Sequence, residues 1–169
     1  MASLNLDIVT AANVYLDDTS LYGKVEKITG PTITPVMKEV KAVGMMGTKK
    51  VWVGFEAIEV DITWKFINEN CTDFFKDYNW KIYGNVVRRE NGTERNLPAY
   101  VELRGRMEDN GIGGDLEGQN WSGQTVKFAV DYIMVKHDNV EILVIDVDNN
   151  IYRDHGVDKF AEMRKNANL

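Results

Sequence analysis

Residues 58–66 read Ile58-Glu-Val-Asp-Ile-Thr-Trp-Lys-Phe66, and apolar side chains alternate with polar ones along the whole stretch. A β-strand points successive side chains to opposite faces, so this alternation predicts a strand with one face on a core and the other toward solvent. The same period returns in residues 101–107 and 126–134, and a nearly continuous apolar run at 140–147 predicts a further strand. The sequence is therefore mainly β.

Two turns support this interpretation. Asn91-Gly92 and His137-Asp138-Asn139 each separate two strand-like runs. Asn, Asp and Gly tolerate the positive φ angles of tight hairpins, so we expect antiparallel pairing at both places. The absence of a linker-like stretch predicts one domain over residues 1–169, as a barrel or two packed sheets.

One segment has a helical period. Its apolar residues are Cys71, Phe74, Phe75 and Tyr78, spaced i, i+3, i+4 and i+7. Asn70 or Thr72 can cap its start, and Asp73 suits the positive end of a helix dipole. We expect a flanking helix of about ten residues there, and a shorter helical turn near residues 157–161.

Composition excludes several classes of protein. The 169 residues carry a formal net charge of −6, with Lys and Arg interspersed among acids, so the chain does not resemble a nucleic-acid binder. The first ten residues lack the pattern of a secretory signal, and no stretch has the length of a membrane span. We therefore expect no membrane insertion. The single cysteine, Cys71, excludes an internal disulfide but leaves both burial and cross-linking of subunits open.

Three patterns resemble chemical motifs and then fail. Residues 146–150, Asp-Val-Asp-Asn-Asn, begin like a calcium loop, but Ile151 and Val157 stand where glycine and glutamate are needed. The glycines of the loop at 109–118 lack the Gly-Lys-Ser/Thr of a phosphate loop. His137 and His155 have no recognisable nucleophile beside them in sequence. We expect no catalytic residue, cofactor or metal.

Features for self-association are present instead. A β-rich domain with open edges presents unpaired N–H and C=O groups that a neighbour can complete. The strand at 126–134 carries further apolar residues on its second face, and the loop Val43-Gly-Met-Met-Gly-Thr-Lys-Lys50 adds two adaptable methionines. A helix covering that strand and an ordinary loop would explain the same features without self-association.

Several short segments are distinctive when they are taken in their order along the chain: Asn13–Leu16, Val43–Met45, Gly54–Glu59, Leu103–Arg106, Val144–Asp146, Gly156–Asp158 and Met163–Asn166 with Leu169. In this order and spacing they resemble the major tail tube proteins of contractile phages and of R-type phage-tail-like bacteriocins. The departures are Val43, where that family has a small residue, and Asn168, where it often has glycine.

The resemblance implies two packed antiparallel sheets in a barrel-like sandwich with one flanking α-helix. It also implies that six subunits join their sheets into a ring around a lumen, and that rings stack into a tube inside a contractile sheath. Sheath contraction would drive the tube through an envelope, and in a phage DNA would pass through as transient cargo. Implied partners are further copies, the sheath protein, a baseplate initiator and a tail terminator, with assembly in the host bacterial cytoplasm.

Residue roles follow as hypotheses. Glu59, Asp61, Thr63 and Lys65 form our candidate lumen-facing row, because their strand alternates most cleanly. Six chains of −6 would give a ring of −36, which favours an acidic lumen that does not hold DNA. An extended assembly loop around residues 41–54 is our candidate for contacts between rings or neighbours. Its proposed contact residues are Val43, Gly44, Met45, Met46, Gly47, Lys49 and Lys50.

Two other classes of function stay open. The tube protein of type VI secretion has a related fold, and it too should form hexamers. A monomeric ligand-binding β-barrel should instead keep a closed apolar pocket. Electron microscopy of the purified chain separates the last class from the others, whereas gene neighbourhood is needed to distinguish a phage from a bacteriocin.

Overall fold

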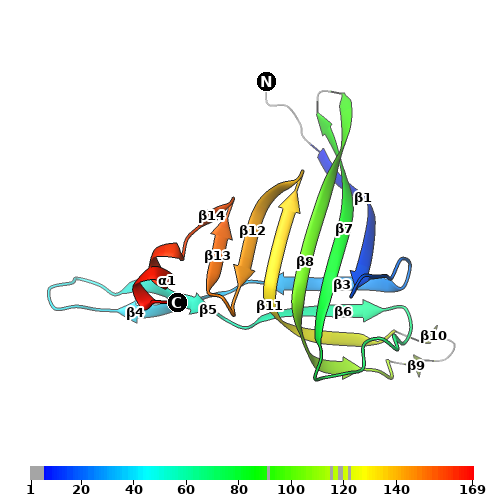
Figure 1. Cartoon of the computed structure of the whole chain (residues 1–169), viewed down its shortest axis with the longest axis horizontal. Helices are drawn as coiled ribbons and strands as arrows, with labels where there is room; N and C mark the ends of the chain where they lie inside the picture. The colour runs from blue at the N-terminus through cyan, green and yellow to red at the C-terminus, as the bar shows by residue number, and fades with distance from the viewer. Residues whose placement is uncertain (1–5, 91, 115, 118–119, 122) are drawn as a thin grey trace.

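A computed structural model of the chain describes residues 6–90, 92–114, 116–117, 120–121 and 123–169 (Figure 1). Asn91 of the first expected turn, and parts of the glycine-rich loop at 109–118, lie outside these residues. The elements are β1 (Leu6–Leu16), β2 (Thr19–Ser20), β3 (Val25–Thr32), β4 (Pro35–Val40), β5 (Lys49–Phe55), β6 (Ile58–Trp64), β7 (Asp77–Glu90), β8 (Thr93–Gly111), β9 (Leu116–Glu117), β10 (Asn120–Trp121), β11 (Thr125–His137), β12 (Val140–Asp146), β13 (Ile151–Asp154), β14 (Val157–Asp158) and α1 (Ala161–Ala167).

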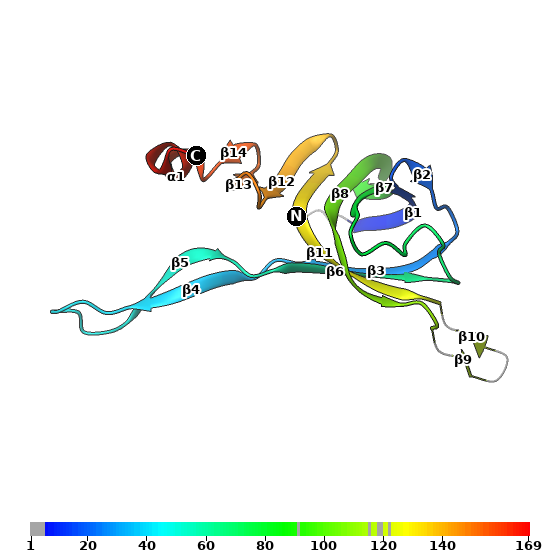
Figure 2. The ribbon, with the colours of Figure 1, turned by 60° about the horizontal axis from the view of Figure 1, so that its bottom comes forward.

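Strand β11 divides the main sheet into two layers. Along one side it pairs with β8 over its whole length; along the other it pairs first with β6 and then with β12. The inner layer therefore runs β3-β6-β11-β8 through the first half of β11. The outer layer runs β14-β13-β12-β11-β8-β7-β1-β2 through the second half. Figure 2 shows β3 and β6 crossing under the outer strands.

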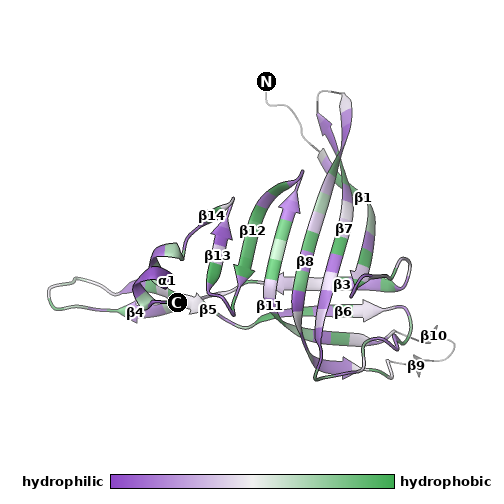
Figure 3. Ribbon diagram, in the orientation of Figure 1, coloured by the Kyte–Doolittle hydropathy of each residue, from purple (hydrophilic) through white to green (hydrophobic). Residues whose placement is uncertain are grey.

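The core lies between these layers. From the inner layer, Ile62, Trp64 and Phe128 point into it, and each is almost fully buried. Trp80 and Leu103 face them from β7 and β8, with the rings of Trp80 and Phe128 5.2 Å apart. Apolar and polar residues alternate along the long strands, as Figure 3 shows. The expected mainly β fold of two packed antiparallel layers is confirmed, although the described residues form no closed barrel within one chain.

A β-bulge at Asp131 explains why β11 is apolar on both faces. Pairing with β8 skips this residue, since Val130 lies opposite Gly105 and Tyr132 opposite Arg104. The inward side chains are therefore even-numbered before the bulge and odd-numbered after it, and Ile133 is fully buried. The sequence left open whether another subunit or a helix covers this second face; a register shift brings part of that face into the core of the same chain instead.

The helix expected at residues 71–78 is wrong. The Asp73 carboxylate accepts a hydrogen bond from the N–H of Phe75 at 2.8 Å, which offers this backbone a partner other than a helical carbonyl. The hydroxyl of Tyr78 donates to the Asp73 carbonyl and accepts from the Asp73 N–H, at 3.0 and 3.1 Å. Cys71 and Tyr78 are buried, but Phe74 and Phe75 are exposed, so the apolar spacing does not mark one packed face.

The one α-helix of the described residues is α1, which begins four residues later than the short turn expected around Val157. Arg164 of α1 donates to the Asp158 carboxylate and to the Asn150 carbonyl, which ties the helix to the strands before it. No helix in the described ranges is long and apolar enough to cross a membrane.

Candidate assembly surfaces

A two-stranded arm formed by β4, β5 and the connecting residues 41–48 projects from the body (Figures 1 and 2). Its strands continue β3 and β6, whose ends are only a few residues from it. β4 has six residues, so at about 3.3 Å per residue the paired part is roughly 20 Å long. The predicted contact residues therefore lie in one place: five are in the connecting loop, and Lys49 and Lys50 begin β5.

The tip of the arm, residues 43–47, presents apolar side chains to solvent. Val43 and Met46 are fully exposed, at 108% and 107% of the reference area. Gly44 has a φ of +90°, and Met45 folds back so that its sulfur accepts from the Ala42 N–H at 3.3 Å. Exposed apolar groups at the end of a projection are typical of an interaction site.

The arm differs from the rest of the chain in charge. Residues 36–53 hold four lysines and one glutamate, a formal charge of +3. Because the whole chain carries −6, the remaining residues carry −9. Only one ion pair is formed within the arm by its described residues, between Lys50 and Glu39 at 4.0 Å, and both side chains are largely exposed. The arm is thus a basic projection from an acidic body.

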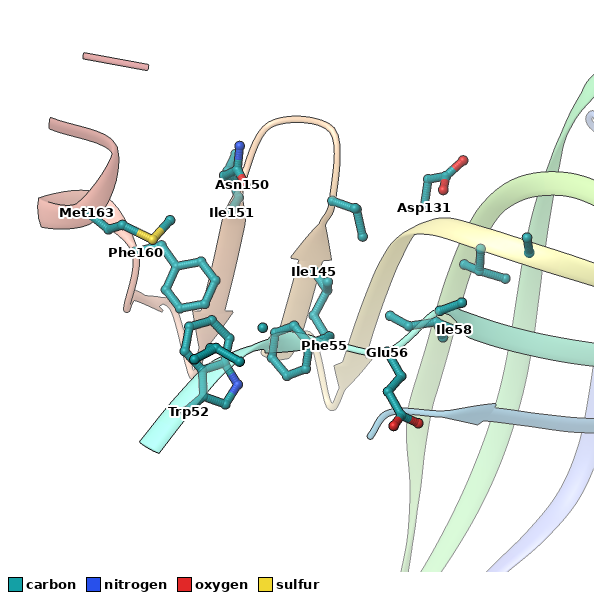
Figure 4. A pocket seen from close by; sticks show the side chains of 16 residues that line it. Trp52, Phe55, Glu56, Ile58, Asp131, Ile145, Asn150, Ile151, Phe160 and Met163 are labelled. Atoms are coloured by element: carbon teal, nitrogen blue, oxygen red, sulfur yellow. The ribbon is translucent and has the colours of Figure 1, made fainter. Parts of the chain in front are cut away.

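A groove of about 480 Å³ lies between the base of the arm and the C-terminal strands and helix (Figure 4). Its aromatic wall is made by Trp52, Phe55 and Phe160. The ring of Trp52 is 4.9 Å from that of Phe160 and 5.4 Å from that of Phe55. Met163 of α1 borders this wall, and Ile145 extends the apolar lining toward the sandwich.

Two carboxylates lie at the end of this groove that is farther from Phe160, as Figure 4 shows for Glu56 and Asp131. Burial raises the pKa of Asp131, and the carboxylates of Asp148 and Asp77 raise it further, against two arginines of β8. Arg104 and Arg106 offset the charges of Asp77 and Asp148, so the negative charge at this end of the groove comes from the Glu56 and Asp131 carboxylates themselves. An apolar basic partner would complement it.

The candidate lumen row lies on the outer face of the inner layer. Glu59, Asp61 and Thr63 alternate with the buried residues of β6, while Lys65 follows the end of that strand. Glu59 accepts a hydrogen bond from Lys127 at 3.2 Å, and this bond raises the pKa of the lysine. The face therefore carries charges of both signs in direct contact.

The inner layer has two open edges. β3 pairs with β6 on one side, and no described strand pairs with its other side. At the opposite border, β8 pairs with β7 only as far as Arg106, so residues 107–111 pair with β11 alone. Backbone N–H and C=O groups at such edges can be completed by another chain.

The groove is the feature that sequence reasoning missed. Trp52 and Phe55 are three residues apart on a strand, and Phe160 is more than a hundred residues away, so no period joins them. In the run that begins like a calcium loop, the Asp146 carboxylate accepts hydrogen bonds from the N–H of Asn149 at 3.1 Å and from its side-chain amide at 2.8 Å. Within the described ranges, no cluster of His, Cys, Asp and Glu could hold a metal ion.

Comparison with known proteins finds both a matching family and a similar protein. A family model described as phage tail tube protein FII matches residues 7–167. The tail tube protein of Escherichia phage P2 is 23% identical over 170 aligned residues, which cover 93% of this chain and 94% of that protein.

Proposed function

The chain belongs to the family of the phage tail tube protein FII, a family of structural proteins and not of enzymes, and from this premise we propose a detailed role for it. It is the repeating subunit of the inner tube of a contractile tail, in a phage or a phage-tail-like particle. Six copies form a ring, rings stack into a hollow tube, and a sheath surrounds the tube. The tube crosses the target envelope when the sheath contracts, and in a phage it conducts DNA.

The two open edges of the inner layer carry this proposal. In a ring, β3 of one subunit pairs with residues 107–111 of β8 in the next, so that the inner layers form one continuous barrel. Closure removes both edges at once and makes a stiff cylinder, as a driven tube requires. The −9 body does not favour close approach of like subunits, so edge pairing must supply enough backbone hydrogen bonds to offset that repulsion.

Closing the barrel in this way turns the row of Glu59, Asp61, Thr63 and Lys65 toward the lumen. The outer face of β6 and β11 points away from the core, which fills the space between the layers. Lys127 is paired there with Glu59, and the charge of Asp61 offsets that of Lys65, so these four side chains present no net positive charge to a passing polyanion. A tube map in which Lys and Arg dominate the lumen would contradict this arrangement.

Electron microscopy of the purified chain, alone and co-expressed with its tail proteins, tests the function. We expect hollow rods of stacked rings. A chain that stays monomeric in every combination would overturn the proposal.

Edge pairing can be tested in the same rods. Cysteines introduced by Thr29→Cys on β3 and Glu108→Cys on the open part of β8 should form disulfides between neighbours after oxidation. Thr29→Cys combined with Asn139→Cys, which lies in the distant β11–β12 turn, is the control. Native Cys71 is buried and does not compete. Rods in which the β3–β8 pair never cross-links would show that other edges close the ring.

The tip residues Val43, Gly44, Met45, Met46 and Gly47, with Lys49 and Lys50, are proposed to contact other subunits. Removing Met45 and Met46 should impair polymerisation and leave the monomer folded, because neither packs against the core. Circular dichroism of the monomer and rod yield measure the two effects separately. If this variant formed normal rods, the tip would not be an assembly contact.

A further inference from the structure

The arm tip and the groove are complementary in both shape and charge. The tip presents the unbranched, adaptable side chain of Met46 and the apolar Val43, both fully exposed. The groove offers an aromatic wall, including Trp52 and Phe160, and thioether sulfur makes favourable contacts with aromatic rings. The groove also has room for such a group, at about 480 Å³.

Charge favours the same pairing. Lys41, Lys49 and Lys50 flank the tip, whereas Glu56 and Asp131 lie at one end of the groove. The adjacent exposed aromatic residues Phe74 and Phe75 form the competing receptor patch. A second groove, beside Phe66, is lined by Lys24 and Lys65 as well as Glu69, so it does not match a basic tip as well.

The tip of a chain is too far from that chain's own groove to fill it. Trp52 and Phe55 line the groove and also form the base half of β5, whereas the tip begins beyond the far end of the strand pair. Between Trp52 and the connecting loop lie three residues of β5, roughly 10 Å of paired strand, and Figure 2 shows the arm directed away from the body. The occupant must therefore come from another copy.

We propose that residues 43–47 at the arm tip of one subunit dock in the groove between Trp52, Phe160 and Asp131 of a second subunit. This deepens the tube function proposed above and rests on it. The contact is heterologous, because the tip and groove are different surfaces of one chain. Each subunit thus gives one tip and receives another, and such contacts propagate into rings or helical filaments.

Mixed cross-linking tests this contact directly. One batch of subunits carries Met46→Cys and a second carries Met163→Cys, at the border of the groove; the two are mixed, assembled and oxidised. Disulfide dimers of one chain of each kind are expected in rods. Val140→Cys replaces Met163→Cys in the control and should give none, because Val140 lies at the β11–β12 turn, although it is the more exposed of the two residues, at 56% against 42%. Phe75→Cys is the third partner and reports docking on the competing patch.

Every result decides. Dimers with Met163→Cys support the inference, and dimers with Phe75→Cys in its place overturn it. Rods that form without either cross-link overturn it too, while leaving the tube function intact. If wild-type chains form no rods even with their tail proteins, the proposed function fails and the inference fails with it.

A second measurement uses the concentration needed for assembly. Met46→Glu places a carboxylate against the acidic groove and should raise the critical concentration at least tenfold, which corresponds to about 1.4 kcal/mol. Val140→Glu adds the same charge at an exposed site outside the groove and should change it less than about twofold. If both variants raised the critical concentration equally, the added charge alone would explain the effect, and docking of the tip would be contradicted.

Discussion

Gly105→Ala should destabilise the fold severely, because Gly105 lies at the corner where the two layers meet. It is buried in β8 opposite Val130, immediately before the bulge at Asp131. Here β11 exchanges its inner-layer neighbour β6 for its outer-layer neighbour β12, and the backbones of β8 and β11 come very close. A Cβ added at Gly105 would lie 2.0 Å from the Ala129 carbonyl oxygen and 2.8 Å from the Val130 Cα.

The free energy lost on Gly105→Ala depends on which atoms must move to make room for the new Cβ. Ordinary contact needs about 3.4 Å, so one strand must shift by more than 1 Å. The clashing atoms belong to the backbone of β11, which pairs with strands on both sides and cannot rotate away like a side chain. Overpacking usually costs about 1–3 kcal/mol, and a backbone clash in a central strand belongs at or above the upper end. We therefore expect a loss of about 3 kcal/mol or more.

Urea unfolding of unassembled subunits, followed by tryptophan fluorescence from the core, measures this loss. For an m-value of about 2 kcal/mol per M, the midpoint should fall by roughly 1.5 M. Gly84→Ala is the matched control: it is also a strand glycine, its nearest contact is the Ala99 Cβ at 3.6 Å, and its φ is not positive. Its midpoint should stay close to wild type or rise slightly, because alanine restricts the unfolded chain. If Gly105→Ala unfolds within about 0.3 M of the wild type, the close approach of β8 and β11 at this corner is wrong.

Three further predictions concern the loop before β7 and the C-terminal helix. Gln124→Ala should cost about 2–4 kcal/mol in urea unfolding, because the fully buried Gln124 amide accepts from the Asn68 N–H at 2.8 Å; an unchanged midpoint would refute that role. Burial, and secondarily Asp17, raises the pKa of the Cys71 thiol to about 12, so iodoacetamide should label it at pH 8 only through unfolding, and rapid labelling of folded protein would contradict its burial. The thiol ionises near pH 9 in the unfolded chain and near pH 12 in the folded chain. The free energy of unfolding is therefore not affected by this thiol below about pH 9, and it declines as the pH rises toward 12. The hydrogen bond from Arg164 lowers the pKa of Asp158, so this pair stabilises the folded chain above the pKa of an unfolded aspartate and loses that effect as the pH falls through the lowered pKa. Asp158→Ala should therefore speed hydrogen exchange in α1, whereas Glu162→Ala should not.

Much of the fold could be predicted because strand alternation is local. From Ile58 to Trp64, the apolar residues of the alternating pattern are the buried ones. The expected hairpin turn at Asp138 and Asn139 has positive φ at both residues. Regular strands need only their own residues to be recognised. The helix failed for the complementary reason: Tyr78 satisfies the backbone of Asp73 through a side chain, and apolar spacing alone cannot reveal that contact.

Of the candidate sites, the one whose residues are contiguous in sequence could be predicted, and the one assembled from distant segments could not. A tip such as Val43–Gly47 can be recognised because its glycines and methionines are adjacent in sequence. The groove cannot, because Trp52, Asp131 and Phe160 come from three separate parts of the chain and meet only after β11 has changed its neighbour. The bulge at Asp131 both turns the sheet and places that carboxylate in the groove. No periodic pattern marks a bulge, so the sequence analysis includes one surface of the proposed contact, the tip, and misses the other, the groove.

The two proposed contacts complement each other physically. Edge pairing is made of backbone hydrogen bonds, which are short-ranged and carry little information about sequence, so by itself it would also permit pairing in a wrong register. It also brings together bodies of −9 each, which repel at long range. The arm carries +3 on a projection of roughly 20 Å, beyond the Debye length of about 8 Å at physiological salt, so it meets an acidic neighbour before the bodies approach. A docked tip would then hold the neighbouring edges in one register, and the order of events would be arm first and barrel second.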